Sequence, residues 1–212
     1  IGNLEDITLR AIRILKEVDL IAAEDTRHTK KLLNHYNIST PLTSYFEHNE
    51  LTKGRFIIAQ IKEGKDAALV SDAGTPGISD PGYRLVRAAL DEGIKVVPIP
   101  GPSAVITALS ASGLPTDKFL YLGFLPVKKG RQTIFKKITE SEHTVVFYES
   151  PHRLLKTLEQ LKAYLQPMAQ VAVAKELTKI YETFFRGTID EVLAQLSKAT
   201  IKGEYVVMVM PT

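Results

Sequence analysis

The stretch from Val70 to Gly82 combines residue types that can hold a ligand at close range. It contains three glycines, which let a backbone approach a ligand closely and adopt positive φ angles. Asp72 and Asp80 would repel a phosphate, and neither GxGxxG spacing nor a GK(S/T) ending is present. We therefore expect this loop to bind a ligand with hydroxyls or positive charge, with a stiff structural turn as the alternative.

A second loop rich in glycine and proline, Pro100 to Ala104, follows another apolar run at residues 94–99. Open α/β sheets bind their ligands at loops that leave the carboxyl ends of strands. The two loops could therefore form opposite walls of one cleft, although this second loop alone is equally well explained as an ordinary turn between a strand and a helix.

Charged residues gather at the ends of three other apolar runs, in residues 24–28, 149–153 and 175–179. Carboxylates and lysines at such positions could accept a proton, whereas arginine and histidine could hold a phosphate. Charge at a strand end is often only a solvated turn, so both readings stay open for these clusters. No spacing of metal ligands stands out, and we expect no metal site.

Periodic apolar residues predict the elements that must position these loops. We expect helices over residues 7–18, 29–35, 51–62, 83–90, 105–112, 154–165 and 189–196. We expect strands over residues 20–23, 41–45, 67–70, 94–99, 119–124, 145–148, 171–174, 182–186 and 205–210. Asp80, which precedes Pro81, and Ser103 are expected to cap the helices that follow them.

The order of these elements predicts an α/β protein with two domains. Strands and helices alternate in the first half, which predicts a mostly parallel sheet, whereas successive late strands predict a mixed sheet. Residues 114–117 read as a linker, so the expected domains are residues 1–115 and 116–212. The chain opens on what looks like the middle of a loop, and we expect a first strand to belong before Ile1.

The composition excludes several classes of protein. The 212 residues include no cysteine, which excludes disulfides, thiol chemistry and zinc–thiolate sites. No apolar run reaches the length of about 18 residues that a transmembrane helix needs, so we expect no membrane association and a cytoplasmic location. The net charge of +3 permits an anionic partner without requiring one.

Taken together and in this order, the motifs resemble the tetrapyrrole methylase superfamily. The resemblance covers nearly the whole chain and implies two α/β domains with S-adenosylmethionine bound in the cleft between them. The central loop has Gly74-Thr75-Pro76, where the tetrapyrrole-modifying relatives carry Gly-Asp-Pro, and those relatives lack the stretch at 149–153 in this form. These differences point to RNA as the substrate. The motifs that carry the resemblance are residues 1–8, 23–27, 71–82, 100–104, 147–153, 175–179 and 204–207.

Within the superfamily, the chain is most similar to the branch that methylates the ribose 2′-oxygen of a cytidine in small-subunit (16S) ribosomal RNA. The resemblance implies a homodimer whose partner is that RNA or the small (30S) ribosomal subunit. It also implies that the cofactor pocket is lined by Asp72, Ala73, Gly74, Thr75, Ile78, Ser103, Ala104, Tyr148 and Leu177.

The remaining candidates follow from the charged clusters. A ribose hydroxyl is a poor nucleophile, so a side chain should accept its proton, and the candidates are Glu149, Asp25, Lys175 and Glu176. The lysine could serve only if its pKa were lowered. Candidates for contact with RNA phosphates are Arg27, His152 and Arg153.

Two other functions compete with this interpretation. A methyltransferase of the same fold could act on a tetrapyrrole or a diphthamide precursor. Alternatively, the chain could be a non-catalytic RNA-binding module of ribosome assembly, which would bind RNA without consuming a cofactor. The density of special residues in the two glycine- and proline-rich loops argues against the second alternative.

Overall fold

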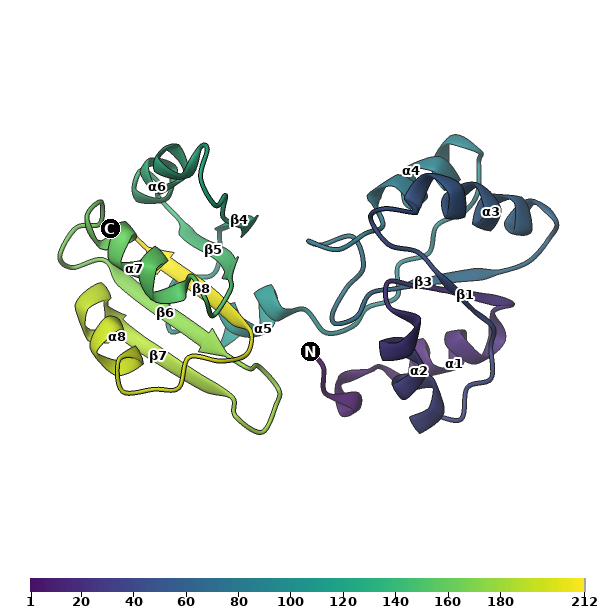
Figure 1. The fold of residues 1–212 in the computed structure, drawn as a ribbon, viewed down its shortest axis with the longest axis horizontal. Helices are drawn as coiled ribbons and strands as arrows, with labels where there is room; N and C mark the ends of the chain where they lie inside the picture. The colour runs from purple at the N-terminus through teal and green to yellow at the C-terminus, as the bar shows by residue number, and fades with distance from the viewer. Residues whose placement is uncertain (212) are drawn as a thin grey trace. The chain divides into compact units, whose positions relative to one another are not determined.

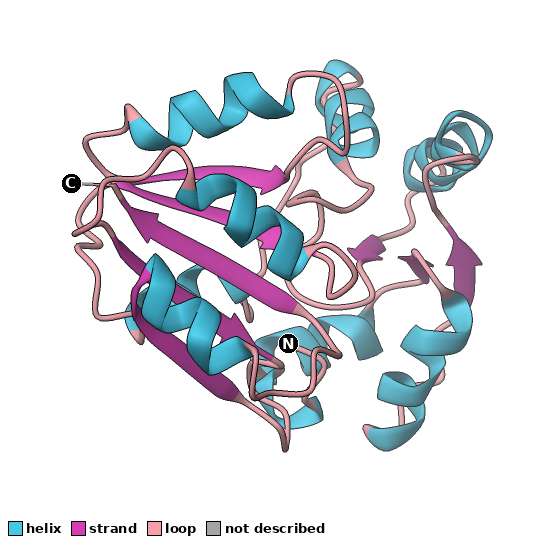
Figure 2. Ribbon diagram, turned by 60° about the vertical axis from the view of Figure 1, so that its left-hand side comes forward, coloured by secondary structure: helices cyan, strands magenta, loops and turns pink. Residues whose placement is uncertain are grey.

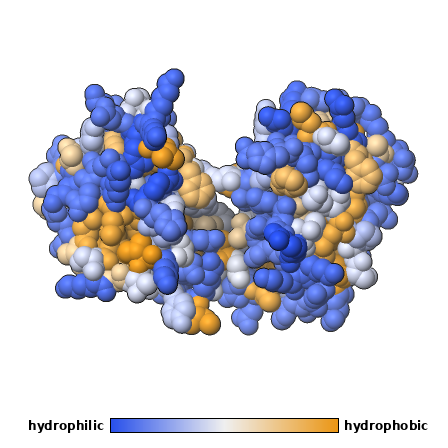
Figure 3. Space-filling model, in the orientation of Figure 1, coloured by the Kyte–Doolittle hydropathy of each residue, from blue (hydrophilic) through white to orange (hydrophobic). Residues whose placement is uncertain are grey.

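The computed structural model describes residues 1–211 and divides the chain into two compact units. Unit 1 comprises Ile1–Pro102 and unit 2 comprises Ser103–Thr212 (Figure 1). Each unit has its own sheet and its own buried core, so each is described by itself. Figure 3 shows a mostly hydrophilic surface on both units, interrupted by smaller hydrophobic areas.

Unit 1 is built on a parallel sheet with the strand order β2-β1-β3. In register, Ala23 at the end of β1 pairs with Ser44 of β2 and with Val70 of β3. The carboxyl ends of all three strands therefore meet at one edge of the sheet, which confirms the predicted parallel arrangement. The strands are β1 (Leu20–Ala23), β2 (Leu42–Ser44) and β3 (Ala67–Val70).

Helices cover both faces of this sheet because neighbouring strand residues point to opposite sides. Ile21 of β1 packs in one core with Leu15 and Leu33, whereas Ala22 packs in the other with Ile57. In Figure 1, α1 and α2 lie on one side of the sheet and α3 and α4 on the other. The helices are α1 (Leu9–Glu17), α2 (Thr26–His35), α3 (Glu50–Lys62) and α4 (Tyr83–Asp91), after a 3-10 helix at Leu4–Asp6.

Two expectations for unit 1 are wrong. Residues 94–99 form no strand, and Val96 and Val97 are 40% and 49% exposed. A strand needs a neighbour for its hydrogen bonds, and no described segment pairs with this one. Asp80 does not cap α4, which begins at Tyr83 with Gly82 as its N-cap at a φ of 156°.

Unit 2 contains a five-stranded mixed sheet with the order β4-β5-β8-β6-β7, as the late strands predicted (Figure 2). Only β4 and β5 pair in parallel among these neighbours. Its strands are β4 (Phe119–Phe124), β5 (Thr144–Glu149), β6 (Gln170–Lys175), β7 (Thr183–Thr188) and β8 (Tyr205–Met210). Its helices are α5 (Ala104–Ser110), α6 (Arg131–Thr139), α7 (Leu154–Lys162) and α8 (Ile189–Leu196).

The core of unit 2 lies on the face of the sheet that carries Val145, Phe147 and Val207, which are fully buried. Helix α5 belongs to this unit because it packs against β8. The structural division therefore falls between residues 102 and 103, before α5, whereas the sequence suggested a linker after that helix. Among residues 1–211, no helix is long and apolar enough to cross a membrane.

Candidate functional site

Unit 1 contains a cavity of about 480 Å³ beside β3, and residues of α1 and α2 also line it. Its lining includes residues 71–76 of the loop after β3 and residues 99–102 of the second glycine- and proline-rich loop. The two loops are joined directly, because the Thr75 hydroxyl donates a hydrogen bond of 3.2 Å to the Pro102 carbonyl. The structure thus brings together the two loops that the sequence singled out.

Gly74 occupies the turn of the loop after β3. Its φ of 91° lies in the left-handed region that favours glycine, and the Ser71 hydroxyl donates a 3.2 Å hydrogen bond to its carbonyl. A Cβ atom at Gly74 would lie 3.6 Å from the Pro102 oxygen, which is an ordinary contact. Backbone conformation, rather than lack of space, therefore requires glycine here.

The predicted cofactor residues fall into three groups. Asp72, Ala73, Gly74 and Thr75 line the cavity, whereas Ile78 is not among its lining residues and is 49% exposed. The other four, Ser103, Ala104, Tyr148 and Leu177, lie in unit 2. Leu177 is buried, and Ser103 is the N-cap of α5 but makes no side-chain hydrogen bond to the helix.

Thr29 is a lining residue that the sequence analysis missed. Its side chain is 4% exposed, and its hydroxyl has no hydrogen-bond partner among the described residues. A buried hydroxyl without a partner is costly, so a polar ligand atom in the cavity would remove that cost. No pattern in the sequence distinguishes Thr29 from other helical threonines, because the signal is the absence of a partner.

Acidic side chains form hydrogen bonds between the segments that follow β1 and β3. The carboxylate of Asp72 accepts a 3.0 Å hydrogen bond from the Asp25 amide, and the Asp72 amide donates a 3.5 Å bond to the Glu24 carboxylate. Burial raises the pKa of Glu24, and burial together with the nearby negative charge of Glu24 raises the pKa of Asp80 to about 6. The sequence analysis placed Glu24 only within the charged cluster at residues 24–28 and did not name Asp80 as a candidate for proton transfer.

Asp25 is tied to Arg27. The two side chains form a bidentate pair with distances of 2.7 and 3.1 Å, and the Asp25 carboxylate also accepts the Arg27 amide at 2.8 Å. These hydrogen bonds hold the pKa of Asp25 well below its usual value. Asp25 is therefore a weak base that caps α2, while the Arg27 side chain stays 89% exposed.

Glu149, the predicted proton acceptor at the end of β5, is 1% exposed. Its carboxylate lies 2.7 Å from the Arg153 guanidinium and accepts hydrogen bonds from the Thr157 hydroxyl at 2.7 Å and the Ser150 amide at 2.8 Å. The carboxylate is thus fully engaged with three groups of its own unit. The neighbouring His152 is exposed, which suits contact with a phosphate.

Glu176 and Lys175 are also engaged with their own unit. Burial alone would raise the pKa of Glu176, but hydrogen bonds from the Glu204 amide at 2.8 Å and the Lys179 ammonium at 3.0 Å lower it overall. The Lys175 ammonium donates to the Thr200 carbonyl at 2.8 Å. The loop after β6 is thus held in place by the residues predicted to accept a proton.

Comparison with known proteins places these features in one family. A family model described as "Tetrapyrrole (Corrin/Porphyrin) Methylases" matches residues 1–193. "Ribosomal RNA small subunit methyltransferase I" of Halalkalibacterium halodurans is 55% identical over 210 residues, which cover 99% of this chain and 72% of that protein. The protein of the same name from Escherichia coli O157:H7 is 52% identical over 212 residues, covering 99% and 74% of the two chains.

The similarity extends to solved structures of lower identity. The crystal structure of a cobalamin biosynthetic enzyme, cobalt precorrin-4 methyltransferase, is 14% identical and superposes with a TM-score of 0.72. The match covers 98% of this chain and 90% of that one. At this level of identity the likeness bears on the fold alone.

Proposed function

Because the chain belongs to the tetrapyrrole (corrin/porphyrin) methylases, we propose that it is an S-adenosylmethionine-dependent methyltransferase that acts on small-subunit ribosomal RNA. One observation carries the proposal. Relatives about half identical to this chain, over nearly its entire length, bear the name ribosomal RNA small subunit methyltransferase I. We also propose the finer statements: the acceptor is the ribose 2′-oxygen of a cytidine, the enzyme is a homodimer, and it works in the cytoplasm.

The cavity of unit 1 fits part of such a cofactor. Its volume of about 480 Å³ lies in the range of small-molecule sites, and its lining includes Asp72 and the unpartnered Thr29 hydroxyl. A carboxylate suits a ligand with a sulfonium and an ammonium group, and the left-handed turn at Gly74 lets the backbone come close. When bound, the cofactor supplies a methyl group on a positively charged sulfur.

Positioning is the main contribution expected of the protein. Methyl transfer is an in-line displacement, and correct alignment of two reactants is worth up to about 7–11 kcal/mol of the barrier. The hydrogen bond between Thr75 and Pro102 supports this role, because it fixes two walls of the cavity against each other. No metal is required for this step.

We also propose which residue accepts the proton of the ribose hydroxyl. Asp25, Glu149, Lys175 and Glu176 all have their polar atoms engaged, so each would have to leave a partner in order to accept the ribose proton. Asp80 also accepts a hydrogen bond from Ser71, but it is the better candidate because a base works best when its pKa approaches the working pH, and burial with the nearby charge of Glu24 raises the pKa of Asp80 to about 6. Asp80 lies in the loop that we assign to the cofactor, beyond the residues of that loop that line the cavity.

Contacts with RNA phosphates are assigned to exposed cations. Arg27 keeps most of its side chain in solvent although it pairs with Asp25, and His152 is exposed. Arg153 is only 25% exposed and is paired with Glu149, so we assign it mainly to the support of the loop that carries His152.

Nucleoside analysis after reaction tests the proposal. The full chain, S-adenosylmethionine and unmodified small ribosomal subunits are incubated, and the RNA is digested and examined by mass spectrometry. We expect 2′-O-methylcytidine to appear in the presence of both enzyme and cofactor. A methylated base would overturn the ribose assignment alone, whereas no methylated nucleoside with either subunits or naked ribosomal RNA would overturn the proposed function.

A further inference from the structure

A β-bulge in β4 turns one aromatic side chain out of the core of unit 2. Leu120 and Leu122 point toward that core, and simple alternation would place Phe124 beside them. The register shifts instead, because Tyr121 pairs with Val146 while Phe124 pairs with Tyr148, so three steps along β4 match two along β5. Phe124 therefore joins Tyr121 on the opposite face of the sheet.

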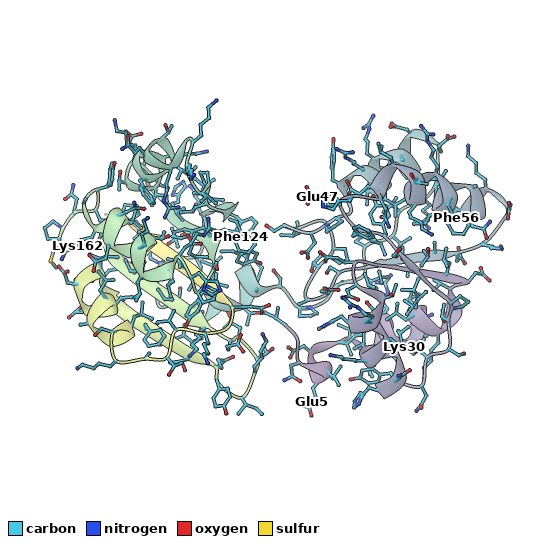
Figure 4. The ribbon with its side chains drawn as sticks, in the orientation of Figure 1. Glu5, Lys30, Glu47, Phe56, Phe124 and Lys162 are labelled. Atoms are coloured by element: carbon cyan, nitrogen blue, oxygen red, sulfur yellow. The ribbon has the colours of Figure 1, made fainter. Side chains whose placement is uncertain are left out.

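The rings at this position form a cluster with one exposed member. The centroid of Tyr148 lies 5.4 Å from that of Tyr121 and 5.4 Å from that of Phe124, both in edge-on geometry. Both tyrosines are half-buried, whereas Phe124 is 56% exposed at the carboxyl end of its strand (Figure 4). The cluster holds the Phe124 ring in place and leaves part of it open to a partner.

The chain segment that contains this ring is basic. The segment from Phe119 to Thr139 contains five lysines and arginines and no acidic residue. Lys128 and Lys129 are exposed in the loop that follows β4, and His152 is exposed in the loop that follows the parallel neighbour β5. Parallel strands end at the same edge, so these two loops flank Phe124.

The buried network around Glu149 fixes both loops. Arg153, paired with Glu149, donates a 3.3 Å hydrogen bond to the Leu125 carbonyl. Arg131 donates to the Pro126 carbonyl at 3.0 Å and to the Thr157 hydroxyl at 2.6 Å, and that hydroxyl in turn donates to Glu149. Two arginines thus hold the backbone just after Phe124, Arg153 paired directly with the buried Glu149 carboxylate and Arg131 linked to it through Thr157, which preorganises the surface before a partner binds.

We propose that Phe124 is a platform on which an unpaired RNA base stacks, with Lys128, Lys129 and His152 contacting the adjoining phosphates. An exposed ring among cations is the combination by which proteins hold single-stranded nucleic acid. An apolar protein partner would gain little from the lysines, so the charge favours RNA. The assignment rests on the proposed function and specifies where its substrate is held.

Binding of a fluorescent single-stranded, cytidine-containing RNA oligonucleotide tests the platform. Phe124→Ala should weaken binding by about 5- to 150-fold, the range that base stacking on an aromatic ring supports. Phe124→Trp should retain it. The matched control is Phe119→Ala, which removes the same kind of ring, 39% exposed, from the other end of β4, and should leave the affinity unchanged.

The same variants are also tested for S-adenosylmethionine binding and for methyl transfer. These measurements distinguish failure of the Phe124 platform from failure of the proposed function. If the wild-type chain methylates ribosomal RNA but Phe124→Ala binds and methylates as well as Phe119→Ala, the platform is wrong and the proposed function stands. If the wild-type chain neither binds RNA nor transfers a methyl group, both are wrong. Thermal unfolding of each variant verifies that loss of affinity is not loss of fold.

Discussion

At the scale of single residues, the site combines groups that favour the fold with groups that oppose it. The pair of Asp25 and Arg27 and the satisfied carboxylate of Glu149 stabilise their surroundings. Asp80 and Thr29 do the reverse, because one is a carboxylate disfavoured by burial and the other a buried hydroxyl without a partner. Residues that oppose folding are those expected where a ligand binds or a reaction occurs.

Asp80→Asn should stabilise the protein at neutral pH. The pKa of Asp80 is raised from 3.8 to about 6, so the folded state holds this proton more tightly than the unfolded chain. The contribution of Asp80 to stability therefore falls as the pH rises through this window and stays low above it. Because the side chain is only partly buried, we expect a gain of about 1 kcal/mol above about pH 7, vanishing below about pH 4.

Thermal unfolding of both proteins across that pH range checks this prediction. A stabilisation of the same size at every pH would show that the effect does not come from titration of Asp80. If Asp80 also accepts the ribose proton, the variant should gain stability and lose methyl transfer together.

Gly74→Val should abolish cofactor binding. Its φ of 91° is strained for any residue with a Cβ, at a cost of about 1–2 kcal/mol, and the side chain would stand beside Pro102 in the cavity wall. The control is Gly113→Val, at a φ of 80° and with nothing within 4 Å of its Cβ. Both variants should lose similar stability, but calorimetric titration with S-adenosylmethionine should fail only for Gly74→Val; equal affinities would contradict our assignment of the loop.

At the scale of elements, the sequence predicts most helices and strands but not their pairing. Local apolar patterns suffice for β1 and β8, because their apolar residues are the ones that become buried in the fold. The run at 94–99 has the same pattern and forms no strand, since a strand also needs a neighbour. The sequence predicts the site in part: it singles out the two loops, yet the contact between Thr75 and Pro102 joins positions far apart in the chain.

Sequence analysis also misses other features that depend on contacts between residues far apart in the chain. The bulge that exposes Phe124 depends on the register with β5, and the network that supports it joins Arg131 and Thr157 to Glu149 across two helices and a strand. Composition indicates only that these residues are polar or aromatic. Their roles follow from burial and hydrogen bonds that appear in the folded unit.

The loop after β6 offers a test at this scale. A Cβ at Gly203, where φ is 93°, would lie 2.5 Å from the Glu176 carboxyl group. Gly203→Ala should therefore displace that carboxylate from the Glu204 amide and from Lys179, which adds about 1–3 kcal/mol to the backbone strain. Gly64→Ala, with a φ of 91° and open space, measures the strain alone. Equal losses of thermal stability in the two variants would contradict this role for Glu176.

At the scale of the whole molecule, two compact units carry different parts of the proposed reaction. Unit 1 provides the cavity and the acidic side chains at the ends of β1 and β3, and unit 2 provides the exposed ring and the basic loops. The chain carries a net charge of only +3, so attraction to RNA must come from local clusters rather than from the molecule as a whole.

Salt dependence should reveal these clusters. If Lys128 and Lys129 each neutralise a phosphate, replacing both with glutamine should make the negative slope of log affinity against log salt concentration shallower by about 1.4 for single-stranded RNA. Lys118→Gln, an exposed lysine before β4, should leave the slope unchanged. If the double variant kept the wild-type slope, Lys128 and Lys129 would not contact RNA phosphates.

Transfer of a labelled methyl group is the measurement that tests the central claim most directly. The full chain is given S-adenosylmethionine labelled in its methyl group, with small ribosomal subunits, naked small-subunit RNA or a porphyrinoid as competing acceptors. Our account predicts that the label enters ribosomal RNA and that Gly74→Val abolishes the transfer. Label in the porphyrinoid, or in no acceptor while RNA still binds, would contradict the account.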